Sequence, residues 1–189
     1  MTGRLMEYVV ALGANLESKY GPPAQTHAAA LCELGREGLK LTALSRFYRT
    51  PFFPSGKGPD FVNAVAVLAA EMGPEDALAT LHRIEASFGR ERRGRWQARP
   101  LDLDLLAAGG EIRPDAATVR AWMDLAPEKQ AVEAPAELIL PHPRLQERAF
   151  VLVPMCDVAG DWVHPILGLT ARQMCAALPQ ADREDAKAM

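Results

Sequence analysis

The sequence lacks several features that would assign it to a class at once. Its three cysteines (Cys32, Cys156 and Cys175) show neither close pairing nor metal-ligand spacing, which argues against a secreted disulfide framework and favours a reducing cytoplasm. Its N-terminus has one apolar run, Tyr8–Leu12, which is too short for a signal-peptide core or a membrane span. It has no excess of one charge either, because 21 Lys plus Arg stand against 24 Asp plus Glu. The net charge of −3 gives no overall attraction to nucleic acid or anionic membrane, so any anion site must be local.

What is present indicates one globular domain. The chain has 189 residues, of which 49% are hydrophobic, and this is enough for a sizeable core. We see no repeat or low-complexity tract. We assign residues 1–189 to a single domain that includes an inserted segment, 111–135, and ends in a polar, frayed tail, 179–189.

The hydrophobic pattern changes its period along the chain and predicts a strand and helix order of βαββαβ. The expected elements are strands at Tyr8–Leu12, Leu39–Thr50, Phe61–Ala69 and Leu101–Leu106, and helices at Ala24–Glu37 and Pro74–Gly89. This order is typical of an α+β, ferredoxin-like fold, an antiparallel sheet with helices on one face. Short helices follow, with one near Thr170–Leu178, and another is expected inside the insert at Ala116–Leu125.

Two aspartates alternate with leucines in the last strand of this pattern. In Leu101-Asp102-Leu103-Asp104-Leu105 the period of two sends both carboxylates to one face, about 6–7 Å apart along the strand. Carboxylates on a rigid strand suit Mg²⁺, which leaves its other positions to water and substrate phosphates. The alternative is a solvated strand face, although aspartate is disfavoured in strands.

A basic segment leads directly into this strand. Between residues 83 and 99 six arginines stand against two glutamates, at positions 83, 90, 92, 93, 95 and 99. Arginine can bind phosphate with two parallel hydrogen bonds, and Gly89 and Gly94 would let the segment close over a triphosphate. The alternative is a solvated basic loop that binds RNA. Glu85 lies at the edge of the buried face of its helix, so it needs a partner, either a neighbouring arginine or a nucleotide hydroxyl.

Aromatic side chains flank the loop between the second and third strands. Phe61 and Asn63 can form a pocket in which a heterocycle stacks on the ring while the amide reads its edge, although core packing is the simpler role for each Phe. Phe150 is a second candidate ring. His142 lies between two prolines and lacks a metal-binding partner, so a phosphate or nucleotide contact is the better hypothesis.

Together these segments resemble the 6-hydroxymethyl-7,8-dihydropterin pyrophosphokinase family, in collinear order over most of the chain. The resemblance is carried by Ala11–Leu16, Ser45–Pro51, Asp60–Ala64, Ile84-Glu85, Gly89-Arg90, Arg95-Trp96, Arg99–Asp104, Pro141–Arg144 and Arg148–Leu152. The Arg-x-x-Asp-x-Asp run and the Pro-His-Pro-Arg to Arg-Ala-Phe run are specific, whereas the Gly-x-Asn opening alone is weak. The family's usual second proline after Thr50-Pro51 is Phe52 here.

The resemblance implies transfer of the β,γ-pyrophosphoryl group of ATP to the pterin hydroxymethyl group, with release of AMP, in folate biosynthesis. It implies that Asp102 and Asp104 hold two Mg²⁺ ions and that Arg90 and Arg99 bind the phosphates. The implied pterin site comprises Thr50, Pro51, Phe53, Phe61, Asn63 and Phe150, and the implied ATP site comprises Glu85, Arg92, Arg95, Trp96, His142 and Arg148. We expect a cytoplasmic monomer that acts on small molecules, without nucleic acid or membrane partners.

Two other functions fit part of the pattern. A ferredoxin-like RNA-binding module would use the aromatics and arginines, but the paired aspartates would repel a phosphate backbone. A Mg²⁺-dependent nucleotidyltransferase would keep the metal ions but release pyrophosphate rather than AMP.

Overall fold

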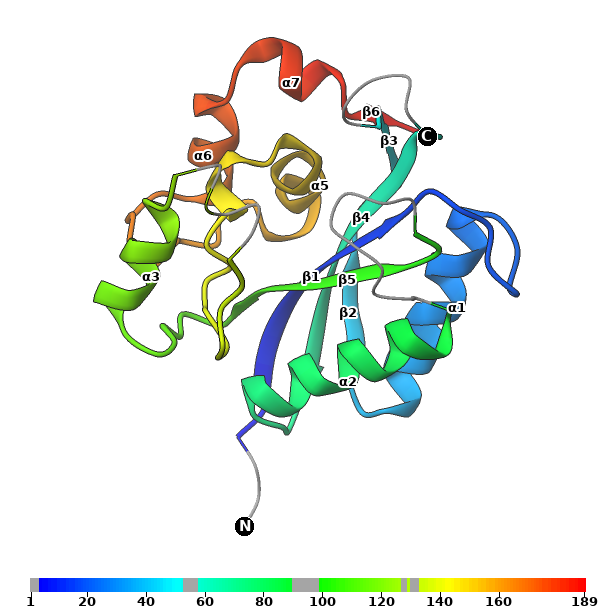
Figure 1. Ribbon diagram of the computed structural model, residues 1–189, viewed down its shortest axis with the longest axis horizontal. Helices are drawn as coiled ribbons and strands as arrows, with labels where there is room; N and C mark the ends of the chain where they lie inside the picture. The colour runs from blue at the N-terminus through cyan, green and yellow to red at the C-terminus, as the bar shows by residue number, and fades with distance from the viewer. Residues whose placement is uncertain (1–3, 53–57, 90–98, 127–128, 130–132) are drawn as a thin grey trace.

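The computed structural model describes residues 4–52, 58–89, 99–126, 129 and 133–189. Within these residues six strands form one sheet (Figure 1), in the order β5-β1-β4-β3-β6 with β2 also paired to β4. The central strand β1 (Met6–Ala14) runs antiparallel to both β4 (Phe61–Ala70) and β5 (Asp102–Ala108). With α1 (Pro23–Arg36) and α2 (Pro74–Ser87), these elements confirm the predicted α+β, ferredoxin-like order.

The region expected to form one strand at 39–50 forms two. These are β2 (Lys40–Leu44) and β3 (Tyr48–Thr50), both antiparallel to β4. Ser45 lies at the break, where its hydroxyl accepts a hydrogen bond from the Val65 N–H and its own N–H donates to the Val65 carbonyl, both at 2.9 Å. A side chain thus replaces one step of the backbone ladder, and the two short strands remain aligned on β4.

Helices cover both faces of the sheet, whereas the sequence pattern predicted helices on one face. Helices α1 and α2 pack against Tyr8, Val10 and Leu12 on one side, and α5 (Ala149–Ala159) packs with α6 (Ala171–Ala177) on the other (Figure 1). The reason is that the alternate residues are apolar too. Val9, Val65 and Leu106 form a second core under α5.

The inserted segment is tied to the domain at its beginning. The backbone of Arg113 pairs with that of Leu140, and α3 (Ala116–Met123) begins after Asp115, whose carboxylate accepts hydrogen bonds from the N–H groups of Ala117 and Thr118. Helix α3 lies within the predicted range, and Val119 is fully buried, so the helix packs one face onto the domain.

The C-terminal tail is ordered, and the prediction of a frayed tail is wrong. It forms α7 (Gln180–Glu184) and then β6 (Lys187–Ala188), which pairs with β3, and the N–H of Met189 donates to the Phe47 carbonyl at 2.9 Å. Strand β3 would otherwise be an edge with unpaired backbone groups, and this pairing satisfies them.

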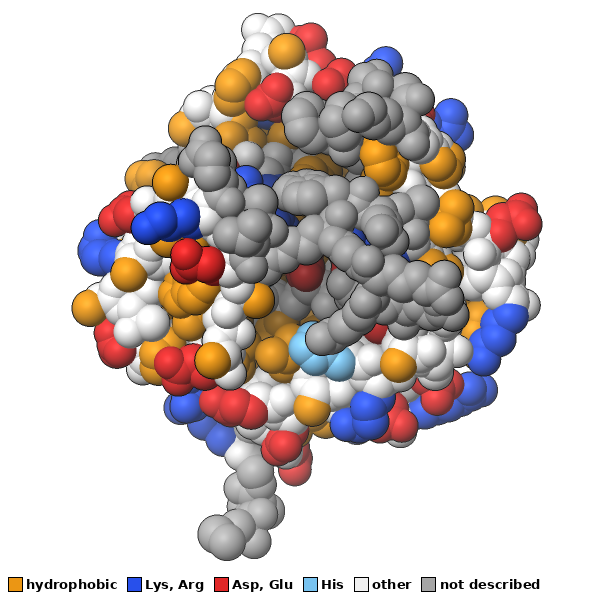
Figure 2. Space-filling view, viewed as in Figure 1, with side chains coloured by type: hydrophobic (Ala, Val, Ile, Leu, Met, Phe, Trp, Pro, Cys, Tyr) orange, Lys and Arg blue, Asp and Glu red, His pale blue; other side chains and the backbone are white. Residues whose placement is uncertain are grey.

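The surface and the helices agree with the near-neutral composition. On the face shown in Figure 2, basic and acidic side chains are interspersed around the rim rather than separated into areas of one sign. Among the helices described, none is long and apolar enough to cross a membrane.

Candidate active site

A row of residues crosses four strands on the face that α5 partly covers. Asp102 of β5 pairs with Gly13 of β1, Gly13 pairs with Asn63 of β4, and Asn63 pairs with Tyr48 of β3. Directly opposed residues in an antiparallel sheet share a face, so one carboxylate and one amide lie on either side of Gly13. A Cβ atom at Gly13 would be 3.1 Å from the Asn63 Oδ1 atom and 3.8 Å from the Asp102 Cβ atom. The glycine therefore leaves open the space between these two side chains.

The alternation in β5 is the one that the sequence predicted. Leu101, Leu103 and Leu105 are buried among α1 and α2, whereas Asp102 and Asp104 lie on the opposite face. Each carboxylate has an arginine partner. The Arg99 Nη1 atom lies 2.7 Å from Oδ2 of Asp102, and the Arg148 Nη1 atom lies 3.6 Å from Oδ2 of Asp104. All four side chains are partly exposed, so the site combines two anions and two cations within reach of solvent.

Glu85 of α2 contacts the backbone of β5, the strand that carries the two aspartates. Its side chain is buried in α2, and its Oε1 atom accepts a hydrogen bond of 2.7 Å from the Leu103 N–H, between the two aspartates. Among the described residues, β5 is at the end of the sheet order and has a strand partner on one side only, and Glu85 satisfies a backbone group on the other side. The partner predicted for Glu85 was an arginine or a nucleotide hydroxyl, and this contact with the backbone of Leu103 was not foreseen.

Arg148, which directly precedes α5, lies beside Asp104, and His142 lies near enough to Arg148 and Asp102 for their charges to affect its ring. The His142 N–H donates to the Leu106 carbonyl at 2.8 Å, and its Nδ1 atom accepts from the Arg144 N–H at 3.1 Å, so the ring hydrogen is on Nε2. Burial lowers the pKa of His142 to about 3, and the positive charge of Arg148 adds to this, so the ring is neutral at pH 7. Burial also lowers the pKa of Arg148, an effect that the charge of Asp104 opposes.

The aromatic and polar residues at the ends of β3 and β4 are brought together by the register. Thr50 pairs with Phe61, and the Asn63 Nδ2 atom donates to the Thr50 Oγ1 atom at 2.7 Å, with both side chains buried. Phe52, which stands where the family has proline, stacks on Phe61 with 5.8 Å between ring centroids and 15° between planes. Pro51, which lies between Thr50 and Phe52 in the sequence, is exposed.

Phe150 stands apart from that stack, at the start of α5. Its ring is 38% exposed, and the Arg148 guanidinium lies 5.7 Å from the ring centroid. An aromatic ring at the beginning of α5 therefore faces solvent on the same side of the sheet as the row.

Comparison with known proteins decides the family. Residues 9–160 match the family described as 7,8-dihydro-6-hydroxymethylpterin-pyrophosphokinase (HPPK). The chain belongs to the HPPK family. It is 35% identical to 2-amino-4-hydroxy-6-hydroxymethyldihydropteridine pyrophosphokinase of Synechocystis over 167 residues, which are 88% of this chain and 73% of that protein. It is 36% identical to the protein of the same name from Haemophilus influenzae, over 82% of this chain and 83% of that one.

The fold of the HPPK family is also seen in solved structures. A crystal structure of HPPK-DHPS from Plasmodium falciparum superposes with a TM-score of 0.63 at 16% identity, over 92% of this chain and 44% of that chain. The chain thus spans less than half the length of that larger protein. At this identity the similarity supports the fold alone.

Two further residues shape the candidate site and are not among the predicted site residues. Gly13 was part of a weak motif, and its role as a gap appears only from the strand register. Asn15 is buried, and its Oδ1 atom accepts from the Arg99 N–H at 2.8 Å while its Nδ2 atom donates to the Pro59 carbonyl at 3.0 Å. It therefore joins the ends of three strands around the site, and an asparagine close after a predicted strand was the available signal in the sequence.

Phe53, Arg90, Arg92, Arg95 and Trp96 lie outside the described residues. Within the ranges that the structure describes, no group of three or more His, Cys, Asp or Glu side chains could hold a metal ion. Asp102 and Asp104 nevertheless fit Mg²⁺ in a nucleotide site, because this ion takes one or two protein carboxylates and completes its shell with water and phosphates.

Proposed function

We propose that this protein transfers the β,γ-pyrophosphoryl group of ATP to the hydroxymethyl oxygen of 6-hydroxymethyl-7,8-dihydropterin and releases AMP, in folate biosynthesis. The observation that carries this proposal is the row of Asp102, Gly13 and Asn63. This row places the Asp102 carboxylate, which can hold a metal ion bound to phosphate, near the Asn63 amide, which can form hydrogen bonds with the edge of a heterocycle. The pterin hydroxymethyl group and the ATP phosphates would meet between them.

The pterin would bind over Gly13 and read the amide of Asn63. Because the Asn63 Nδ2 atom already donates to Thr50, its Oδ1 atom, which faces the Gly13 gap, is available to accept from the N–H groups of a pterin edge. Phe61 and Phe150 would stack on the two faces of the pterin ring. Thr50, Pro51 and Phe53 would complete this half of the site.

The nucleotide would lie on the β5 side. Arg99 and Arg148 would turn from the carboxylates to the phosphates, and the neutral His142 can donate its Nε2–H to a phosphate oxygen. We assign Arg90, Arg92, Arg95 and Trp96 to the same half of the site. Glu85 would act here by holding Leu103 and, with it, the two aspartates.

Asp102 and Asp104 would hold two Mg²⁺ ions. When bound, these ions supply positive charge that neutralises the triphosphate. The chain's own residues orient the hydroxymethyl oxygen for attack on the β-phosphorus, so that the bond to the α-phosphate oxygen breaks and AMP leaves. We assign no side chain as nucleophile, because orientation and charge neutralisation account for transfers of this kind.

Product analysis tests the reaction. The protein is incubated with ATP, Mg²⁺ and the hydroxymethyl-dihydropterin, and AMP, ADP and pyrophosphate are quantified. AMP that forms only when the pterin is present supports the proposal. Release of pyrophosphate would indicate a nucleotidyltransferase, and ADP would indicate transfer of a single phosphoryl group.

We further propose that residues 1–189 act as one domain, as a monomer in the cytoplasm, on these small molecules and without nucleic acid. The interspersed surface charge and the net charge of −3 support the exclusion of nucleic acid. Light scattering after size-exclusion chromatography tests the monomer. Retention on a DNA or RNA column at physiological salt would contradict the exclusion.

A further inference from the structure

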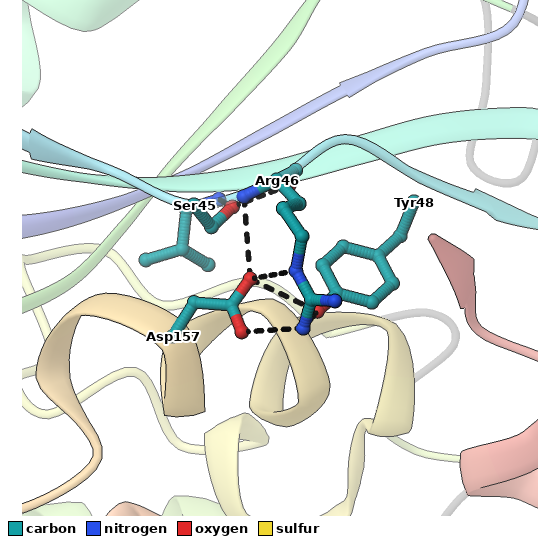
Figure 3. Close-up of polar contacts among 5 residues, drawn as sticks. Ser45, Arg46, Tyr48 and Asp157 are labelled. Atoms are coloured by element: carbon teal, nitrogen blue, oxygen red, sulfur yellow. Dashed lines mark hydrogen bonds and ion pairs between the residues drawn. The ribbon is translucent and has the colours of Figure 1, made fainter. Parts of the chain in front are cut away.

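The carboxylate of Asp157 joins helix α5 to Tyr48 of β3 and to Arg46, which precedes β3 (Figure 3). Its Oδ2 atom accepts from the Tyr48 hydroxyl at 2.9 Å, from Nε of Arg46 at 3.1 Å and from the Arg46 backbone N–H at 3.2 Å. Its Oδ1 atom accepts from Nη2 of Arg46 at 2.8 Å. The same Nη2 donates to the Tyr48 oxygen at 2.7 Å. Four of these five hydrogen bonds join residues 109 or 111 positions apart in the chain, and the fifth joins Arg46 to Tyr48.

The charges of this cluster are matched. The hydrogen bond from Arg46 lowers the pKa of Asp157, so the carboxylate stays ionised. Burial and the hydrogen bond to Asp157 raise the pKa of Tyr48 to about 12, so the hydroxyl keeps the proton that it donates. The Arg46 side chain is 64% exposed, and an ion pair this open to solvent typically adds under about 1 kcal/mol to stability. Its geometric effect is therefore the more informative one.

The cluster lies in register with the proposed pterin site. Tyr48 pairs with Asn63, and Tyr48 and Thr50 are alternate residues of β3, so their side chains share the face toward α5. On the helix, Phe150 and Asp157 are seven residues apart, which is about two turns, so they project from the same side of α5. Asp157, which anchors the helix, thus lies on the same side of α5 as Phe150, the candidate pterin-stacking ring.

Two polar contacts, called tethers below, hold the two ends of α5 across the sheet, in addition to its apolar packing on the second core. At its start Arg148 contacts Asp104 of β5 at 3.6 Å, and toward its end Asp157 contacts Tyr48 of β3. The first tether involves a proposed metal-binding carboxylate, so it would change when substrates bind, whereas the second would not. Pro154 has no N–H to donate to the Phe150 carbonyl, so the turn that carries Phe150 has one helix hydrogen bond fewer. The position of this turn depends correspondingly more on the tethers.

We propose that Asp157 is a positioning residue that, through Tyr48 and Arg46, sets the distance between the ring of Phe150 and the wall formed by Thr50, Asn63 and Phe61. The consequence is selective. The pterin, which occupies that space under the proposed function, loses affinity when the tether is cut, while ATP, on the β5 side, does not.

The test uses Asp157→Asn and Tyr48→Phe in the full chain, with Asp161→Asn as matched control. Asp161 follows α5 and pairs with Arg172 at 3.4 Å, so its change removes the same charge without touching β3. Dissociation constants for pterin and for an ATP analogue are measured by calorimetry, together with KM, kcat and thermal midpoints.

We expect each site variant to weaken pterin binding by about 3- to 10-fold, as for the loss of one or two hydrogen bonds. ATP affinity should stay within about twofold, and Asp161→Asn should change neither. The double variant should be no weaker than the weaker single variant, because both substitutions cut one tether. Asp157→Glu, which keeps the carboxylate, should recover part of the loss.

Three results would overturn the proposal. These are equal losses for pterin and ATP, a lowered thermal midpoint with unchanged pterin affinity, and additive effects in the double variant. The proposed function is judged separately on the wild type. If the wild type and the variants bind the pterin equally well and form AMP, only the role of Asp157 is refuted. If the wild type neither binds the pterin nor forms AMP, the proposed function and the role of Asp157 are both refuted.

Discussion

Gly13→Ala gives the sharpest test of the proposed site. The backbone of Gly13 does not adopt the left-handed conformation that requires glycine, so alanine can take its place in β1. Alanine in a strand interior even stabilises by up to about 1 kcal/mol relative to glycine. The substitution therefore adds a methyl group to the site and leaves the fold in place.

The size of the effect follows from the two neighbours. The new methyl carbon would stand 3.1 Å from the Asn63 Oδ1 atom, which is closer than ordinary van der Waals contact. The amide cannot withdraw freely, because its Nδ2 atom is held by Thr50 at 2.7 Å. Loosening one such hydrogen bond costs about 0.5–1.5 kcal/mol, or roughly 2- to 12-fold in affinity. The methyl group also occupies space that the pterin edge needs, so we expect a loss of about tenfold or more.

The assay is calorimetric titration of the variant with the pterin and, separately, with an ATP analogue. Gly35→Ala is the control. Gly35 lies in α1 with nothing within 4 Å of its added Cβ, so alanine there should raise the thermal midpoint and leave both affinities unchanged. Wild-type pterin affinity in Gly13→Ala, with the fold intact by circular dichroism, would show that the pterin does not bind over this glycine.

Three further predictions concern the carboxylates, a buried histidine and the insert. Asp102→Asn and Asp104→Asn should each lower kcat by about 10²-fold or more with little change in thermal midpoint, and excess EDTA should stop the wild type; near-normal turnover would remove the metal assignment. Burial lowers the pKa of His164 to about 4, so its contribution to stability is complete above about pH 6.5 and is lost as the pH falls toward 4. His164→Asn should therefore show a smaller fall in urea midpoint between pH 7 and pH 5, and an unchanged fall would refute this. Replacing residues 115–135 by a Gly/Ser connector should remove the buried Val119 and lower the thermal midpoint while AMP formation continues; a folded but inactive protein would place the insert in the site.

Local patterns in the sequence predicted most of the fold and the shared face of the two aspartates. The period of two in residues 101–105 put both aspartates on one face, and the structure confirms it, because side-chain alternation is a property of the single strand. The Ala/Leu-rich run before Gly38, and Pro74 with the helical spacing up to Gly89, gave the limits of α1 and α2 to within about two residues. The family followed from collinear motifs for the same reason, since each motif is contiguous.

Contacts between distant segments were decided only by the tertiary structure. Nothing near Gly13 in the sequence indicates that it separates Asn63 from Asp102, because strand order and register place these residues opposite one another. The same holds for the stacking of Phe52 on Phe61 and for the strand that the tail adds beside β3. In the sequence Asp157 is a single charged residue in an apolar helix, and only the packing of α5 shows that it contacts Tyr48. Periodicity determined which face each side chain occupies, whereas pairing across the sheet and packing of α5 determined which side chains meet.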